Sequence, residues 1–118
     1  MEMTIRKSGE VYIVDVLGEM DLYNSYKLKD LISKMIEKDI KAFVINLDKV
    51  DYIDSSGIGV LIYICTTVKK ADLQLAITNV HGSVQKVISL TKLNVFFPIV
   101  DTVDNAVKKL SDPDKKDD

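Results

Sequence analysis

The stretch Asp54-Ser55-Ser56-Gly57-Ile58-Gly59 decides the fold, because it joins two apolar segments of different kinds. Residues 43–47 form a short, β-branched, apolar run that is typical of a buried strand. Residues 60–68 form a longer apolar run that ends in Lys69-Lys70, a basic pair that suits the negative end of a helix dipole. The pattern predicts a buried strand, a tight turn and a helix over residues 55–70.

The start of this predicted helix carries groups that suit an anion. Asp54, Ser55 and Ser56 can each accept a hydrogen bond from the free N–H groups of a first helical turn. Gly57 and Gly59 have no side chains, so we expect them to clear the surface and let another molecule approach the backbone. A hydroxyl group at the positive end of a helix is a natural place to hold a phosphate.

Length and composition predict one domain with one core. The 118 residues are 47% apolar and 29% charged, and a formal net charge of −2 without a basic stripe argues against nucleic acid as a partner. The longest apolar run, residues 58–68, is too short to cross a bilayer, and the amino terminus lacks the apolar core of a signal peptide. The single cysteine, Cys65, has no partner for an internal disulfide and is expected to be a buried, small apolar side chain. We therefore expect a cytoplasmic protein with no membrane partner.

Strand and helix patterns alternate along the rest of the chain. The expected strands are at residues 3–7, 11–17, 43–47 and 73–78, with a short edge strand within residues 94–100. The expected helices follow caps at Asn24 or Ser25, at the central motif, at Ser83 and at Thr102. Residues 18–21, Asp48 and Asp51 are expected in turns or caps, and His81 in a surface turn.

This order, β-β-α-β-α-β-α-β-α, predicts an α/β protein with a mixed, mostly parallel sheet of about five strands and about four helices. Residues 1–111 are expected to form the domain and residues 112–118 a charged, flexible tail. Ligands of such sheets bind where strands end and helices begin, which is where the central motif is expected to lie.

Few residues support catalysis. The only histidine, His81, is expected in a turn, the serine-hydrolase elbow and the phosphate-binding loop motif are absent, and one histidine with one cysteine cannot form a usual zinc site. We expect no catalytic residue, no metal ion and no cofactor.

A receiver-like phosphoacceptor remains an alternative, because Asp48, Asp51 and Asp54 have the spacing of carboxylates that hold Mg²⁺. Such a receiver needs an acidic pair after its first parallel strand and a lysine late in the sheet. This chain has Glu19 and Asp21 at the first place and lacks the expected lysine.

Ser55 has a structural and a functional interpretation. It can act as a plain helix cap, as many serines before helices do. Two adjacent serines are more than one cap requires, however, and two glycines in a first turn cost helix stability, roughly 1 kcal/mol each relative to alanine. These features favour a functional role for Ser55, with Ser56 as a cap or positioning residue.

The stretch from Asp54 to Leu61 resembles the phosphorylation motif of bacterial anti-sigma factor antagonists, the small single-domain members of the STAS family. The resemblance covers roughly residues 3–110. It includes the Gly18-Glu19-Met20-Asp21 turn, the Ile45-Asn46-Leu47 strand, Tyr52-Ile53 and the Leu90-Thr91-Lys92-Leu93 segment, in order and at matching spacing.

The resemblance implies a regulatory binding protein and not an enzyme. Its unphosphorylated form would bind an anti-sigma factor that is also a serine kinase, and so free a sigma factor. The kinase would phosphorylate Ser55, the modified form would release its partner, and a PP2C-type phosphatase would restore binding. The implied partner-binding residues are Asp21, Asn24, Asp54, Ser56, Gly57, Ile58 and Gly59.

Some of these assignments have alternatives. Asp21 and Asn24 can equally cap the first helix, and Asp54 can fix the turn and orient Ser55. The whole chain can also be a STAS scaffold or a transporter-associated module that does not switch, with Ser55 as a plain cap.

Overall fold

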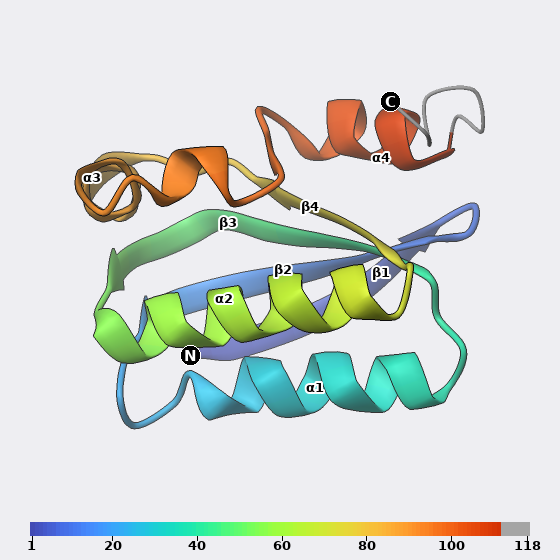
Figure 1. The fold of residues 1–118 in the computed structure, drawn as a ribbon, viewed down its shortest axis with the longest axis horizontal. Helices are drawn as coiled ribbons and strands as arrows, with labels where there is room; N and C mark the ends of the chain where they lie inside the picture. Colours follow the sequence, from blue (N-terminus) through green and yellow to red (C-terminus); the bar gives the residue numbers. More distant parts are fainter. Residues whose placement is uncertain (112–118) are drawn as a thin grey trace.

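Five strands lie side by side in the order of the sequence, β1-β2-β3-β4-β5. The computed structural model describes residues 1–111, and Figure 1 shows their arrangement. β1 pairs with β2 antiparallel, and each later neighbouring pair is parallel. The elements are β1 Glu2–Ser8, β2 Val11–Met20, α1 Tyr26–Glu37, β3 Ala42–Ile53, α2 Ser55–Lys70, β4 Gln74–Thr78, α3 Gly82–Leu90, the 3-10 helix η1 Leu93–Val95, β5 Ile99–Val100 and α4 Val103–Ser111. The predicted α/β fold with a mixed, mostly parallel sheet is confirmed.

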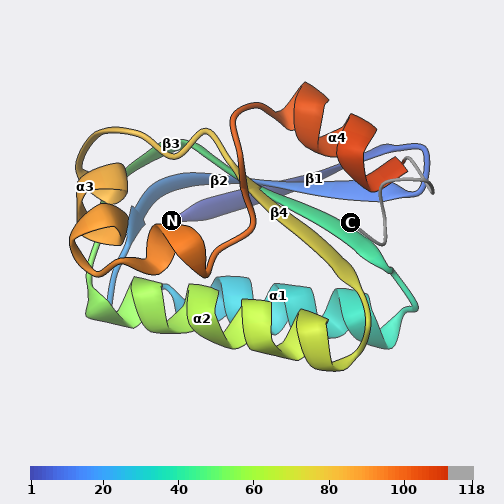
Figure 2. The same cartoon turned by 45° about the horizontal axis from the view of Figure 1, so that its top comes forward.

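The helices cover the two faces of the sheet unequally. In Figures 1 and 2, α1 and α2 run side by side under one face, and α4 lies on the other. The larger core joins α1, α2 and α3 to side chains such as Val14, Phe43 and Ile45. The smaller core joins Ala106 of α4 to Val44 and Ala76 on the opposite face. The central strands are therefore covered on both faces, which explains their nearly continuous apolar sequences.

A row of polar side chains crosses the sheet on the face that carries α4. Arg6 donates to Asp15 through Nε (2.7 Å) and Nη2 (3.1 Å). Asn46 Nδ2 donates to Asp15 Oδ1 at 2.8 Å, and Asn79 Nδ2 donates to Asn46 Oδ1 at 2.9 Å. The hydrogen bonds from Arg6 lower the pKa of the Asp15 carboxyl. The row thus links β1, β2 and β3 to the residue that follows β4.

The prediction of a turn over residues 18–21 was wrong for residues 18–20 and right for Asp21, and the prediction of turns or caps at Asp48 and Asp51 was wrong. β2 continues to Met20 and β3 to Ile53, so both aspartates lie within a strand. The register shifts twice, and pairing resumes each time, with Gly18 opposite Val50 and Met20 opposite Ile53. These irregularities let the ladder continue past the polar residues that read as a turn in the sequence.

The predicted caps have mixed outcomes. Thr102 caps α4, because its Oγ1 accepts from Asn105 N at 3.1 Å. Ser25 is at the cap position of α1, but its side chain makes no capping bond. Ser83 does not cap α3, because it lies inside the helix and donates from Oγ to the Asp51 carbonyl at 2.7 Å.

The last strand is short, because only two of the residues in the range 94–100 are in a strand. Within residues 94–100 the structure has part of η1 and a two-residue strand, β5, at the sheet edge. The expected tail, residues 112–118, lies outside the described residues. Across residues 1–111, none of the helices has the length and apolar character needed to cross a membrane.

Candidate functional site at the amino end of helix α2

Asp54 builds the start of α2. Its backbone is extended, and its Oδ1 accepts from Ser56 N at 2.9 Å and from Gly57 N at 3.2 Å. Its Oδ2 accepts from Leu22 N at 3.1 Å, and its own N–H donates to the Met20 carbonyl at 3.1 Å. One carboxylate therefore caps the helix and also ties it to the loop between β2 and α1.

The loop that Asp54 holds is fixed by its own polar side chains. Asp21 Oδ1 accepts from Tyr23 N at 2.9 Å, and Asn24 Oδ1 accepts from Asp21 N at 3.0 Å. Ser25 Oγ donates to the Asp21 carbonyl at 2.7 Å. Asp21 and Asn24 thus stabilise the turn before α1, whereas the expected alternative, that they cap the helix, was wrong, because Ser25 is at the cap position.

This loop presents Leu22 and Tyr23 to solvent, with 68% and 82% of their surfaces exposed. They lie beside the start of α2, because Leu22 N is bonded to Asp54. Sequence reasoning missed both residues. The available signal was an apolar pair enclosed by turn-forming Asp21 and Asn24, where a core residue is not expected.

Ser55 does not cap α2, because Asp54 takes that role. It is the first residue of the helix and is exposed. Within residues 1–111, the Ser55 hydroxyl group has no hydrogen-bond partner. The side-chain hydrogen bonds at this helix start are all accepted by Asp54. The neighbouring Ser56 is half-buried, and its backbone N–H is bound to Asp54. Ser55 therefore offers an unengaged hydroxyl at the positive end of a 16-residue helix.

The two glycines of the motif have opposite environments. A Cβ atom on Gly57 would lie 2.6 Å from Ile53 Cγ1 and 2.7 Å from the Met20 carbonyl oxygen, so Gly57 is needed for close packing of α2 on β2 and β3. A Cβ atom on Gly59 would have nothing within 4 Å. The expectation that Gly57 clears the outer surface was wrong, because it is buried, whereas Gly59 is open. Ile58 also faces the core, with 8% of its surface exposed.

The carboxylates of a receiver-like site do not come together. Asp48 and Asp51 lie on β3, where their carbonyls accept from His81 Nε2 at 2.8 Å and from Ser83 Oγ. In the described part of the chain, no three His, Cys, Asp or Glu side chains are grouped so that they could hold a metal ion. The interpretation of these aspartates as the Mg²⁺ ligands of a receiver is therefore wrong. Their spacing arises because Asp48 and Asp51 lie on β3 and Asp54 caps α2.

Together, the fold and the site define an α/β domain with a mixed five-stranded sheet and an unengaged serine hydroxyl at the start of its second helix. The chain belongs to the STAS domain family, whose family model matches residues 2–106.

Known proteins extend this assignment. A Staphylococcus aureus protein named anti-sigma-B factor antagonist is 28% identical over 82 residues, which cover 70% of this chain and 76% of that protein. The crystal structure of an anti-sigma factor antagonist from Mycobacterium paratuberculosis has a TM-score of 0.84 at 24% identity, with 94% of both chains covered. The Bacillus cell fate determinant SpoIIAA in its phosphorylated form has a TM-score of 0.71 at 18% identity, covering 91% of this chain and 97% of that chain. At these identities the structural likenesses show the fold.

Proposed function

We propose that this protein is an anti-sigma factor antagonist whose binding is switched off by phosphorylation of Ser55. The observation that carries the proposal is the exposed Ser55 hydroxyl, which has no hydrogen-bond partner among residues 1–111, while Asp54 caps the helix. A kinase can therefore modify Ser55 without removing a group on which the fold depends. The Staphylococcus aureus relative, named for antagonism of an anti-sigma factor, supports the class of partner.

A phosphate at this position would change the surface more than the fold. It adds about −1.5 to −2 charges, and the positive end of α2 offsets part of that charge within the protein. The Asp54 carboxylate is already present next to Ser55, and Asp21 lies in the loop that Asp54 holds. A partner that fits a neutral hydroxyl would meet both bulk and concentrated negative charge. A loss of about 2.7 kcal/mol would weaken binding roughly a hundredfold.

The proposed contact surface surrounds Ser55. Leu22 and Tyr23 supply exposed apolar area, and Gly59 leaves the adjoining helix surface open to the partner. Asp21, Asn24 and Ser56 are half-buried and border this surface. Asp54, Gly57 and Ile58 support the surface from within, through the cap and the packing of α2 on the sheet.

The proposed partners are an anti-sigma factor with serine kinase activity and a PP2C-type phosphatase that acts on the phosphorylated form. In this circuit the protein is a substrate and a switch, without catalytic groups of its own, and it acts in the cytoplasm, where sigma factors work. The structural neighbour SpoIIAA has been solved in a phosphorylated form, which supports the proposal of a phosphorylation switch.

Phosphosite mapping by mass spectrometry, on protein purified from its native cells, tests the switch. Phosphate on Ser55 is the expected result. An unmodified Ser55 under every growth condition would favour a STAS scaffold that does not switch.

Binding to the anti-sigma factors encoded in the same genome tests the partner. We expect Ser55→Ala to bind as the unmodified protein does and Ser55→Asp to bind about a hundredfold more weakly. Ser8→Asp is the matched control, because it adds the same charge at an exposed position at the end of β1, beside the turn to β2. Equal binding by the two Ser55 variants would contradict the proposal.

A further inference from the structure

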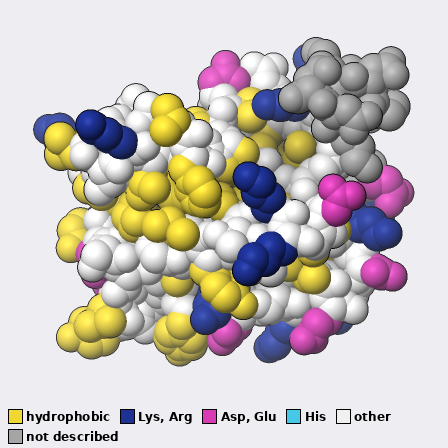
Figure 3. Space-filling view, viewed as in Figure 1, with side chains coloured by type: hydrophobic (Ala, Val, Ile, Leu, Met, Phe, Trp, Pro, Cys, Tyr) yellow, Lys and Arg dark blue, Asp and Glu magenta, His cyan; other side chains and the backbone are white. Residues whose placement is uncertain are grey.

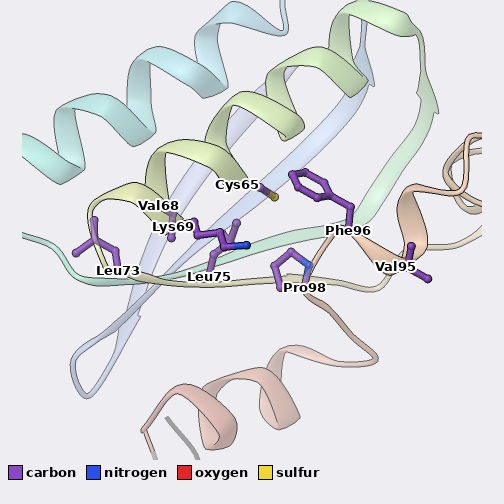
Figure 4. A pocket seen from close by; sticks show the side chains of 8 residues that line it. All are labelled: Cys65, Val68, Lys69, Leu73, Leu75, Val95, Phe96 and Pro98. Atoms are coloured by element: carbon purple, nitrogen blue, oxygen red, sulfur yellow. The ribbon is translucent and has the colours of Figure 1, made fainter. Parts of the chain in front are cut away.

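The carboxyl-terminal half of α2 and the segment from η1 to β5 enclose a groove that the proposed switch does not use. Its volume is about 340 Å³, at the small end of ligand-binding pockets. It is lined by Cys65, Val68, Lys69, Leu73, Leu75, Val95, Phe96 and Pro98. In Figure 4, Phe96 points toward Cys65, and the Lys69 side chain extends toward Pro98. Burial raises the pKa of the Cys65 thiol to about 12, so the sulfur lines the groove as a neutral, apolar atom.

Apolar side chains remain exposed around this groove. Val95 is 87% exposed, and Phe96 is 45% exposed although its neighbour Phe97 is buried. Leu90, at the end of α3 and shortly before η1, is 77% exposed. Figure 3 shows hydrophobic side chains gathered on this face, between α3 and α2. An apolar patch that the core does not require marks an interaction surface.

The charged side chains between residues 55 and 100 are almost all positive. The chain has 18 acidic residues, and Asp72 is the only one between residues 55 and 100. The same stretch carries Lys69, Lys70, Lys86 and Lys92. Lys69 lines the groove, and Lys92 directly precedes η1. The charge on the groove lining itself is therefore the Lys69 cation, with Lys92 next to η1 and Asp72 next to Leu73.

We propose that this groove binds an acidic, amphipathic segment of a partner protein. Apolar side chains of the segment enter between Cys65 and Phe96, and its carboxylates pair with Lys69 and Lys92. The surface is hollowed between a helix and a sheet edge, and inserted side chains fill such a hollow, whereas a flat bilayer does not. Lys69 is 14 residues beyond Ser55 on α2, about 21 Å along the helix, so this proposal is independent of the Ser55 switch.

The probe is a labelled synthetic helical peptide with leucines along one face and glutamates on both flanks. Fluorescence anisotropy measures its binding to the full chain, and backbone NMR shifts locate it. We expect shifts at Val68, Lys69 and Phe96 without shifts at Ser55, and weaker binding at high salt. The same peptide with lysines in place of the glutamates should bind at least about tenfold more weakly. Equal binding of the two peptides, or shifts that avoid the groove, would overturn the proposal.

Two groove variants and one matched control sharpen the test. Lys69→Glu removes the cation at an exposed position, and Phe96→Glu places a charge at the groove wall. Each should weaken binding of the acidic peptide at least about tenfold. Ile5→Glu is the control, because Ile5 on β1 is 48% exposed, close to the 45% of Phe96, and lies outside the groove. Wild-type affinity of the Lys69→Glu variant would contradict the assigned role of Lys69.

Other occupants give distinct results in the same set of proteins. Vesicles of anionic lipid that bind wild type but not Phe96→Glu, with no binding of the peptide, would assign the groove to membranes. Self-association in analytical ultracentrifugation that Phe96→Glu abolishes, again without peptide binding, would assign it to a second copy of this chain. Either result would overturn the proposal.

Discussion

Helices α2 and α3 both follow a strand and both carry a serine in the first turn, but the hydroxyl groups of the two serines differ in their hydrogen bonding. At α2, Asp54 accepts from two backbone N–H groups, and the Ser55 hydroxyl has no partner in the part of the chain that the structure describes. At α3, His81 is at the cap position without a side-chain capping bond, and Ser83 donates to the Asp51 carbonyl. Asp54 therefore supplies the capping bonds beside Ser55, whereas the Ser83 hydroxyl itself holds α3 to β3.

The two helix starts are also anchored differently. The start of α3 is held to β3 through the side chains of His81 and Ser83, each of which binds a strand carbonyl. The start of α2 is held by its own cap and by the close contact of Gly57 with Ile53 and Met20. Substitutions at the two helix starts should consequently have different effects on the free energy of unfolding and on local hydrogen exchange.

Gly57→Ala should have the largest effect on stability. Its Cβ would lie within 3 Å of Ile53 Cγ1 and the Met20 carbonyl, so the helix must move and the free energy of unfolding should fall by about 1–3 kcal/mol. Gly59→Ala is the control, because open space surrounds that position and alanine favours the helix by up to about 1 kcal/mol. Urea denaturation of both variants checks the difference. Equal effects would contradict the inward packing of Gly57.

Asp54→Ala should be the next most severe change. It removes the cap of α2 and the bond to Leu22 N, and the loss of a helix cap costs about 0.5–2 kcal/mol. Hydrogen exchange at the Leu22 and Gly57 amides should become faster. His81→Ala should leave those two amides unchanged, because its contacts are with β3. Unchanged exchange at Leu22 in Asp54→Ala would show that the loop does not depend on this carboxylate.

Ser83→Ala and Ser55→Ala should differ in the free energy of unfolding, by a smaller amount than the variants above. Ser83→Ala removes a hydrogen bond to Asp51, which is worth about 0.5–1.5 kcal/mol. Ser55→Ala removes no such bond and should change stability by less than about 0.5 kcal/mol. Thermal unfolding of the two variants measures the difference. A larger loss for Ser55→Ala would mean that its hydroxyl has a structural role.

The smallest expected effect concerns the polar row that ends at Asn79, shortly before α3. The pKa of Asp15 is lowered in the folded protein by hydrogen bonds from Arg6, so this stabilisation is complete above the unfolded pKa and disappears as the pH falls through the folded pKa. The Arg6 side chain is 54% exposed, which limits the effect to under about 1 kcal/mol.

Arg6→Leu tests this pH dependence. The variant should be slightly less stable than wild type at neutral pH and equal to it in strong acid. Urea midpoints at the two pH values provide the measurement. A difference that persists undiminished in strong acid would assign the loss to packing of the Arg6 side chain and not to the ion pair.

The strand, turn and helix around the central motif could be predicted because the signals there are local. A buried apolar strand precedes Asp54, and the polar residues of a helix start stand directly before a long apolar run. The continuation of β2 beyond Leu17 and of β3 beyond Leu47 could not be predicted. It depends on the pairing of Gly18 with Val50 and Met20 with Ile53 across irregularities in register, which no single segment reveals.

The position of the site in the chain could be predicted, but the burial and the hydrogen bonds of its individual residues could not. Gly57 and Gly59 look alike in the sequence, and only the packing of α2 on the sheet distinguishes the buried glycine from the open one. Ser55 and Ser83 likewise look alike, and only the approach of β3 engages one hydroxyl and not the other. Leu22 and Tyr23 read as ordinary apolar residues until the Asp54 bond places them beside Ser55.

The sheet order, β1-β2-β3-β4-β5, has a consequence for the way in which the chain is made. Each strand pairs with the strand synthesised just before it, so a chain that leaves the ribosome amino terminus first can extend the sheet at one growing edge. No strand has to be inserted between two that have already paired. The last strand to be added is β5, whose two residues leave little free edge on that side of the sheet for another chain to join.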